Sequence, residues 1–159
     1  MSTMYHQLES VLDATGWQIL EALQEDARIP FTELGRRVGM SPPAIAERVR
    51  RLEEAGIITG YRAQIDLSKA GFPITAIMRL TADGDCQGTG ATIARNIPEV
   101  LECYRVTGTD DYIMKVTADS VAGLENLIDR VAAYGSCITS LVLSTPRSGR
   151  IVRKGLGQE

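Results

Sequence analysis

Histidine and cysteine are scarce in this sequence, and their scarcity argues against several kinds of site. The chain has one histidine, His6, and three widely spaced cysteines, Cys86, Cys103 and Cys137. The sequence therefore has too few histidines to favour a catalytic triad or a histidine-based metal site. The odd, scattered cysteines fit neither a disulfide framework nor a paired metal knuckle. We expect buried thiols, no metal, no cofactor and no enzymatic activity.

Long apolar runs are missing as well. No stretch approaches the roughly 18 apolar residues of a membrane helix, and the first residues lack the cationic and apolar segments of a secretory signal. The 159 residues, 44% hydrophobic and 23% charged, are typical of a globular protein with one core or two small ones. We expect a cytoplasmic protein without a membrane partner.

Positive charge is concentrated locally, although the whole chain has a net charge of −3. Between residues 36 and 51 there are five arginines and a single acid, Glu47. Charge alone favours a solvated helix face on which arginines pair with Glu47, Glu53 and Glu54. A local stripe of arginine is also the electrostatic footprint of many nucleic-acid sites. The helix boundaries decide between these two interpretations.

Two helices are predicted before residue 40. Apolar residues at helical spacing favour a helix over 12–24, capped either by Asp13 or by a capping box of Thr15 and Gln18. A second, shorter helix follows and ends at Gly39.

A third helix is predicted to begin at Ser41. The Ser41 hydroxyl is expected to cap a backbone amide, Pro42 suits the first helical position, and Gly56 ends the helix. Its inward stripe consists of Ile45, Val49 and Leu52. The compact turn and the capped start are those of a helix-turn-helix, whose second helix enters the major groove of DNA. Together they outweigh the argument from charge alone and favour binding to double-stranded DNA.

The outward side of the third helix supplies the candidate DNA contacts. Ser41 and the first-turn amides are placed to meet a phosphate. Arg48 can fork onto guanine and Glu47 can accept from cytosine, whereas the remaining arginines suit backbone phosphates. The candidate set is Ser41, Pro43, Ala44, Glu47, Arg48 and Arg51, with Arg36, Arg37 and Arg50.

After Gly56 the periodicity changes. Residues 57–58 and 61–65 are predicted as short extended segments, followed by a linker. Four strands and two helices follow in the order βαββαβ, with strands over 74–82, 100–107, 112–118 and 138–144 and helices over 89–97 and 120–134. This order is that of a ferredoxin-like antiparallel sheet with helices on one face. We predict an α+β protein with a DNA-binding domain (1–62), a linking strand and hinge (63–73) and a second domain (74–159) that ends in a basic tail.

The turn between the second and third strands has two interpretations. Its residues Gly108, Thr109, Asp110, Asp111 and Tyr112 are partly typical hairpin-turn residues. They also offer amides for a carboxylate and an aspartate for an ammonium group, which an amino-acid zwitterion requires. Residue chemistry leaves the two interpretations evenly balanced.

Several segments, above all 37–41, 47–61 and 106–112, are similar to the leucine-responsive/asparagine (Lrp/AsnC, feast/famine) family of transcription regulators. The resemblance covers nearly the whole chain. It implies a winged helix-turn-helix, a linking strand and an effector-binding domain that assembles dimers into octamers or larger rings. The departures are Gly16, where the family usually carries an acid, and Tyr134–Ser136 in place of a proline-glycine-valine step.

The resemblance also implies an amino-acid-like effector at the turn, with Gly108, Asp111 and Tyr112 at the matching positions. We further expect Thr139 and Ser140 to contribute hydroxyls from a neighbouring subunit. Three other functions stay open: an architectural protein that wraps DNA with little specificity, a metabolite sensor that no longer binds DNA, and a decarboxylase of similar architecture. The decarboxylase is disfavoured because residues 74–159 contain no histidine.

Overall fold

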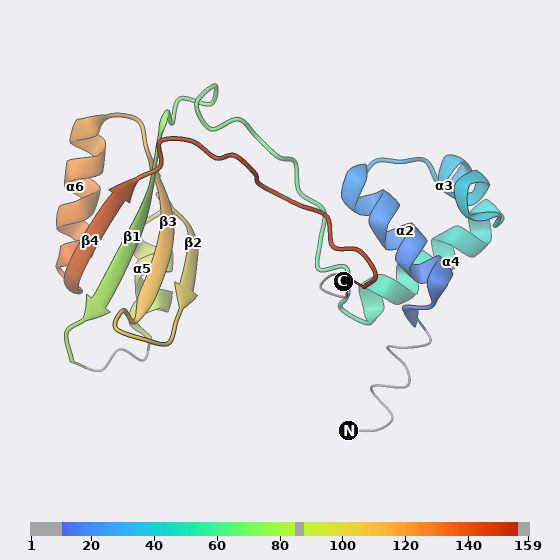
Figure 1. Ribbon diagram of the computed structural model, residues 1–159, viewed down its shortest axis with the longest axis horizontal. Helices are drawn as coiled ribbons and strands as arrows, with labels where there is room; N and C mark the ends of the chain where they lie inside the picture. The colour runs from blue at the N-terminus through green and yellow to red at the C-terminus, as the bar shows by residue number, and fades with distance from the viewer. Residues whose placement is uncertain (1–10, 85–87, 156–159) are drawn as a thin grey trace. The chain divides into compact units, whose positions relative to one another are not determined.

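The computed structural model describes residues 11–84 and 88–155 and divides them into two compact units. The first unit comprises residues 11–63 together with 147–155, and the second comprises residues 64–146. Figure 1 shows a helical first unit and a second unit built on a sheet. His6 and Cys86 lie outside the described residues, whereas Cys103 and Cys137 are free, half-buried thiols. Burial raises the pKa of both thiols.

Three helices build the first unit: α2 (Ala14–Glu25), α3 (Phe31–Val38) and α4 (Pro42–Glu54). All three were predicted. They enclose one core whose fully buried members are Ile19, Leu34, Ile45 and Leu52. The start of α2 is capped by Asp13, whose carboxylate accepts from the Gly16 amide at 2.7 Å.

The predicted extended segments after α4 do not form strands in the described part of the first unit. The amides of Ile57 and Ile58 both donate to the carbonyl of Leu52, at 3.0 and 3.1 Å, and so close the end of α4. Because these donors are used locally, they are not available to a strand ladder. The predicted linking strand over 63–73 is also irregular and contains a hydrogen-bonded turn over 66–71.

The basic tail packs with the first unit, although the sequence placed it in the second domain. The side-chain amide of Gln24 on α2 donates to the Val152 carbonyl at 2.9 Å and accepts from the Val152 amide at 2.8 Å. Arg153 lies 3.6 Å from Glu25 and 3.9 Å from Glu21. The side chain of Gln24 thus bonds both the amide and the carbonyl of Val152, and these two hydrogen bonds hold the tail against α2.

The second unit has the predicted βαββαβ order. It runs β1 (Ile74–Ala82), α5 (Thr89–Asn96), β2 (Val100–Arg105), β3 (Tyr112–Ala118), α6 (Val121–Ala132) and β4 (Gly135–Leu141). The strands lie side by side as β2-β3-β1-β4, with every pair antiparallel (Figure 1). The first and third strands match the predicted bounds, and β4 begins three residues earlier than predicted.

One face of this sheet is covered by the two helices. Ala76, Met78 and Leu80 of β1 alternate with outward residues and pack with Ile93 of α5 and Leu127 of α6 in one buried core. This one-sided covering follows from strand geometry, because successive side chains point to opposite faces. We call the other side the open face; it carries Ile77, Arg79, Tyr104, Ile113, Lys115, Ile138 and Ser140.

A tight contact between α5 and β3 provides a test of the second unit. A Cβ atom on Gly90 would lie 2.3 Å from the ring of Tyr112, which is buried and cannot move aside freely. We expect Gly90→Ala to lower the free energy of unfolding by about 1–3 kcal/mol, the usual cost of overpacking. Urea titration followed by circular dichroism measures this loss.

Gly123→Ala on α6 is the matched control. Its new methyl group would chiefly meet an oxygen of the exposed Asp119 side chain, which can turn away. Equal destabilisation by the two substitutions would contradict the assigned role of the Tyr112 contact.

Candidate nucleic-acid interface and effector loop

A tight turn joins α3 to α4. Gly39 ends α3 with φ 72°, a left-handed conformation that glycine adopts without strain, and the Met40 amide donates to the Gly35 carbonyl at 2.9 Å. Ile45, Val49 and Leu52 turn the inner side of α4 into the core. The opposite side of α4 therefore faces away from its own unit.

The predicted cap at Ser41 is only partly correct. Ser41 is the N-cap residue of α4 with extended backbone, but its hydroxyl makes no capping hydrogen bond. Pro43 at the second helical position has no amide proton, so only the Ala44 amide at the third position remains of the two that an N-cap side chain usually accepts from. For the same reason, the predicted phosphate site at the first-turn amides reduces to the hydroxyl of Ser41 and the later amides such as that of Ala44.

The candidate DNA contacts divide by exposure. Ser41, Pro43, Arg36, Arg37, Arg50 and Arg51 are exposed, whereas Ala44, Glu47 and Arg48 are half-buried. Except for Arg48, the arginines are within reach of a large ligand. Their guanidinium groups nevertheless have partners within the protein.

Arg48 points toward the start of α2. Its Nη1 donates to the Asp13 carboxylate at 2.8 Å, and its side chain is 27% exposed. Asp13 thus both caps α2 and holds an arginine of α4. The base contact assigned to Arg48 stays a prediction, and it requires this ion pair to open. Asp13 was missed as a partner because the two residues are 35 positions apart.

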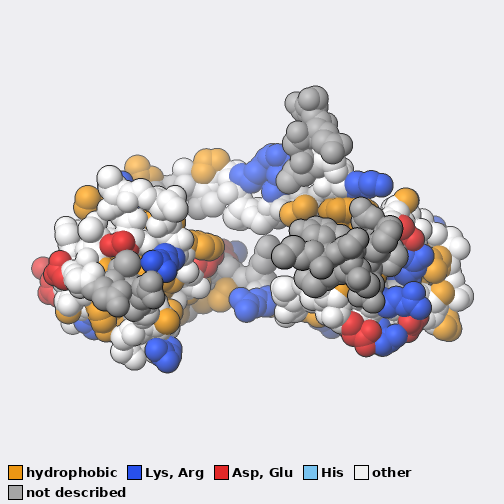
Figure 2. Space-filling view, turned by 90° about the horizontal axis from the view of Figure 1, so that it is seen from below, with side chains coloured by type: hydrophobic (Ala, Val, Ile, Leu, Met, Phe, Trp, Pro, Cys, Tyr) orange, Lys and Arg blue, Asp and Glu red, His pale blue; other side chains and the backbone are white. Residues whose placement is uncertain are grey.

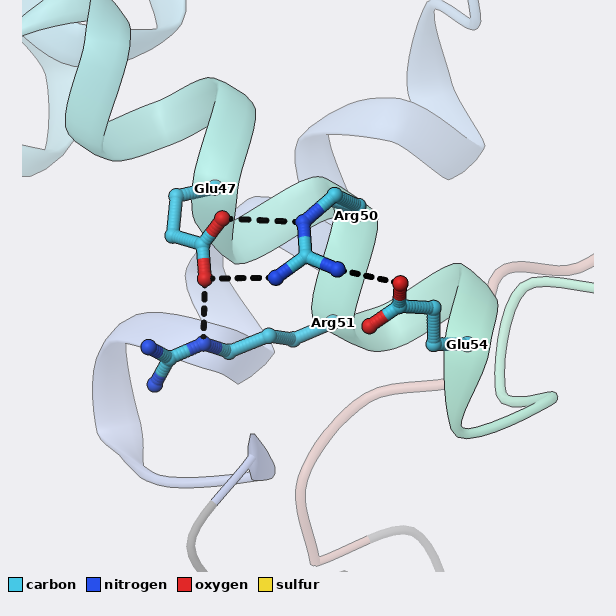
Figure 3. A network of polar contacts seen from close by, with 4 residues as sticks. All are labelled: Glu47, Arg50, Arg51 and Glu54. Atoms are coloured by element: carbon cyan, nitrogen blue, oxygen red, sulfur yellow. Dashed lines mark hydrogen bonds and ion pairs between the residues drawn. The ribbon is translucent and has the colours of Figure 1, made fainter.

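Glu47 lies between two arginines on the exposed side of α4 (Figure 3). Its Oε1 accepts from Nη2 of Arg50 and from Nε of Arg51, each at 2.9 Å, and its Oε2 accepts from Nε of Arg50 at 2.9 Å. Arg50 also bonds Glu54. The hydrogen bonds from Arg50 and Arg51 lower the pKa of Glu47 to about 2. Glu47 is therefore an anion throughout the physiological pH range.

A similar carboxylate bridge lies on α3. Glu33 accepts from Arg36 at 2.9 Å through both oxygens and from Nε of Arg37 at 3.1 Å, and these bonds lower its pKa to about 2. Figure 2 shows acidic and basic side chains alternating along one edge of the first unit. The sequence predicted pairing with Glu47 and Glu54 but overlooked Glu33, although its spacing from Arg36 and Arg37 was visible.

Glu53 pairs differently from the prediction. Its carboxylate accepts from the hydroxyl of Tyr61 at 2.9 Å. Desolvation and this hydrogen bond raise the pKa of Tyr61 to about 12. The contact ties the segment after α4 back to the helix.

The predicted effector loop is held against the end of β1. The Asp111 carboxylate accepts from the Ala82 amide at 2.9 Å, and the Thr109 carbonyl accepts from the Thr81 hydroxyl at 3.2 Å. Asp110 lies 3.8 Å from Arg79. These contacts support the hairpin-turn interpretation, and they leave ligand binding by these aspartates as a prediction.

The remaining effector candidates are dispersed. Gly108 is exposed with φ 122°, whereas the buried Tyr112 lines a surface cavity of about 420 Å³ beside α5. Thr139 lies on the helix-covered side of β4 and Ser140 on the open face, because neighbouring strand residues alternate. The structure therefore does not bring Thr139 and Ser140 to one side of the sheet within a single chain.

Neither a metal-binding cluster nor a membrane-spanning helix is present in the residues that the structure describes. Within residues 11–84 and 88–155, no group of three or more histidine, cysteine, aspartate and glutamate side chains could hold a metal ion. No helix in those ranges is long and apolar enough to cross a membrane.

The outward face of α4 and its turn to α3 define a helix-turn-helix DNA-binding protein, and comparisons with known proteins agree. Residues 12–53 match the AsnC-type helix-turn-helix domain, and residues 75–152 match the Lrp/AsnC ligand binding domain. The chain belongs to the Lrp/AsnC family of transcriptional regulators. This membership confirms the family, the α+β class and the regulatory function predicted from the sequence.

Similar proteins cover most of the chain. The regulator LrpC of Bacillus subtilis is 33% identical over 84% of this chain and 92% of its own, and its structure has a TM-score of 0.81, with 86% and 98% covered. A feast or famine regulatory protein from M. tuberculosis, complexed with L-methionine, is 30% identical to this chain with a TM-score of 0.85. The match covers 89% of this chain and 99% of that protein's chain. An L-methionine complex of a Neisseria meningitidis regulator is 29% identical with a TM-score of 0.80, covering 86% and 93%.

The two contacts of Asp13, with the Gly16 amide and with Arg48, generate a stability prediction. Asp13→Ala is expected to lower the free energy of unfolding by about 0.5–2 kcal/mol, because α2 loses its cap. The Gly16 amide and then Arg48 hold the pKa of Asp13 below its ordinary value. The stabilisation is therefore present above the unfolded-state pKa of about 3.9 and is lost as the pH falls through the lower folded-state value.

Urea titrations of the wild type and Asp13→Ala from about pH 6 toward pH 2 check both parts, since the difference between them should shrink in acid. Gln18→Ala, at an exposed position of the same helix, is the control. A difference that stays constant down to the lowest pH would contradict the assigned role of the carboxylate.

Proposed function

We propose that this regulator binds operator DNA with the outward face of α4, in the cytoplasm, and that an amino acid bound by the second unit changes the affinity. The observation that carries the proposal is the division of α4 into a buried aliphatic side and an exposed side that begins at Ser41 and Pro43. Such a helix can enter the major groove without exposing its core residues.

Two features support an amino acid as effector. Two structures similar to this chain are described as complexes with L-methionine. The loop over 108–112 combines an exposed glycine with two aspartates, and Tyr112 borders a cavity. Asp110 and Asp111 already have partners within the chain, so an ammonium group would have to share or replace those contacts.

Genomic footprinting with and without a panel of amino acids tests this proposal. We expect protected sites of defined sequence, and one amino acid should change the affinity by about 5–150-fold, the range of typical allosteric coupling. Gel-shift titrations on one protected site and on a random duplex measure the change. Long protection without sequence preference would instead support an architectural protein, and absence of binding even at low salt would support a sensor alone.

A homodimer is the simplest arrangement in which two copies of α4 meet successive major grooves. The open face offers a surface for a second copy. Across one row it carries Tyr104, Ile113, Arg79 and Ile138 in register, and Tyr104 and Ile138 are 54% and 52% exposed. Assembly of such dimers into octamers or larger rings belongs to the same proposal.

Ile138→Asp should weaken self-association at least tenfold, because it replaces an exposed apolar side chain of the proposed interface with a carboxylate that would have to be desolvated. Sedimentation velocity over a range of protein concentrations measures the change. Val121→Asp, which replaces another exposed apolar residue at the start of α6, serves as control. The proposed interface would be wrong if both variants associated like the wild type, or if Val121→Asp alone dissociated.

A further inference from the structure

Arg50 and Arg51 are neighbours on α4 with equal charge and similar exposure. Their side chains are 54% and 60% exposed, and each bonds Glu47 (Figure 3). From sequence they are equivalent candidates for a phosphate contact. The hydrogen bonds of their guanidinium groups show that they are not equivalent.

Arg50 binds carboxylates through every nitrogen of its guanidinium group. Its Nε and Nη2 donate to the two oxygens of Glu47, each at 2.9 Å, and its Nη1 donates to Glu54. All three nitrogens of the guanidinium therefore have an anionic partner. A phosphate at the two terminal nitrogens of Arg50 would therefore have to share or displace the carboxylates of Glu47 and Glu54.

Arg51 is anchored at one point only. Its Nε donates to Oε1 of Glu47 at 2.9 Å, and this is its ion pair among the described residues. Figure 3 shows its two terminal nitrogens on the far side of the guanidinium from Glu47. These nitrogens form the planar fork that binds phosphate in a bidentate manner.

The spacing of the residues produces this difference. Glu47 precedes Arg50 by three positions and Arg51 by four, so all three lie on one side of the helix. The same Glu-x-x-Arg-Arg order on α3 gives the same geometry: Arg36 bonds both oxygens of Glu33, and Arg37 uses only Nε. The arrangement on α4 differs in one respect: Arg50 has a second carboxylate partner, Glu54, in addition to Glu47.

We propose that Arg51, not Arg50, is the phosphate contact of α4, and that Glu47 is a positioning residue that aims the Arg51 fork rather than a group that contacts a base. A single exposed ion pair contributes little to stability. Its effect here is to restrict the orientations of a long side chain before binding, which lowers the entropy cost of the contact. The inference rests on the proposed DNA binding and assigns its contacts more finely.

Arg50→Ala and Arg51→Ala form a matched pair, because each removes one positive charge from the same helix. Their affinities for a random-sequence duplex are measured by fluorescence anisotropy over a series of NaCl concentrations. Arg51→Ala should reduce the slope of log affinity against log salt by about 1, the value for one phosphate contact. Arg50→Ala should reduce it by less than half as much. Equal reductions, or a larger one for Arg50→Ala, overturn the assignment.

Glu47→Asp tests the positioning role at constant net charge. The shorter side chain withdraws the carboxylate from both arginines, so we expect affinity for the same duplex to fall several-fold and Arg51→Ala to cost less in this background. Glu54→Asp is the control, since Glu54 bonds Arg50 and not Arg51. Wild-type or tighter binding by Glu47→Asp overturns the role of Glu47, and thermal melts verify that each variant is folded.

DNA binding by the protein and the division of roles between Arg50 and Arg51 are tested separately. If the wild-type protein binds no duplex even at low salt, the proposed function is wrong. If the wild type binds but the two arginine variants behave alike, the proposed function stands and only the division of roles between Arg50 and Arg51 is wrong.

Discussion

Burial of Ile45, Val49 and Leu52 is the constraint on which the candidate interface depends. These three side chains are at most 4% exposed and fix the rotation of α4 about its own axis. Once that rotation is set, 3.6-residue periodicity decides which residues face outward. The turn at Gly39 sets the direction in which α4 leaves α3. The DNA-binding surface is thus a consequence of the small core beneath it.

Charge on this surface is balanced rather than simply positive. The two interpretations that charge alone left open, ion-paired helix face and nucleic-acid site, are compatible, because the arginines pair with carboxylates while remaining on the outward side. Glu33 and Glu47 stay ionised and lie among the arginines that would meet phosphate. Nearby anions lower unspecific attraction to DNA, which is long-ranged and depends on charge. A protein with net charge −3 would then depend on well-oriented contacts more than on overall attraction.

In the second unit, too, burial of one side of an element decides which residues face outward, but the element is a strand of a sheet. Alternation along β1 sends Ala76, Met78 and Leu80 toward α5 and α6 and leaves Arg79 on the open face. The loop over 108–112 is fastened to the end of β1 by Asp111. Any ligand held by this loop would therefore be coupled to the end of β1, a central strand that also contributes to the face proposed to meet another copy.

The sequence by itself determined the three helices of the first unit, the βαββαβ order of the second and the family, because these depend on local periodicity, turn residues and short motifs. It also set the outward side of α4. Only the tertiary structure decided which partners the charged groups take. Arg48 finds Asp13 from a distant helix, Val152 returns to Gln24, and Asp111 bonds the end of another strand. Such pairings depend on how the chain brings remote residues within about 3 Å of each other, and local pattern carries no information about that.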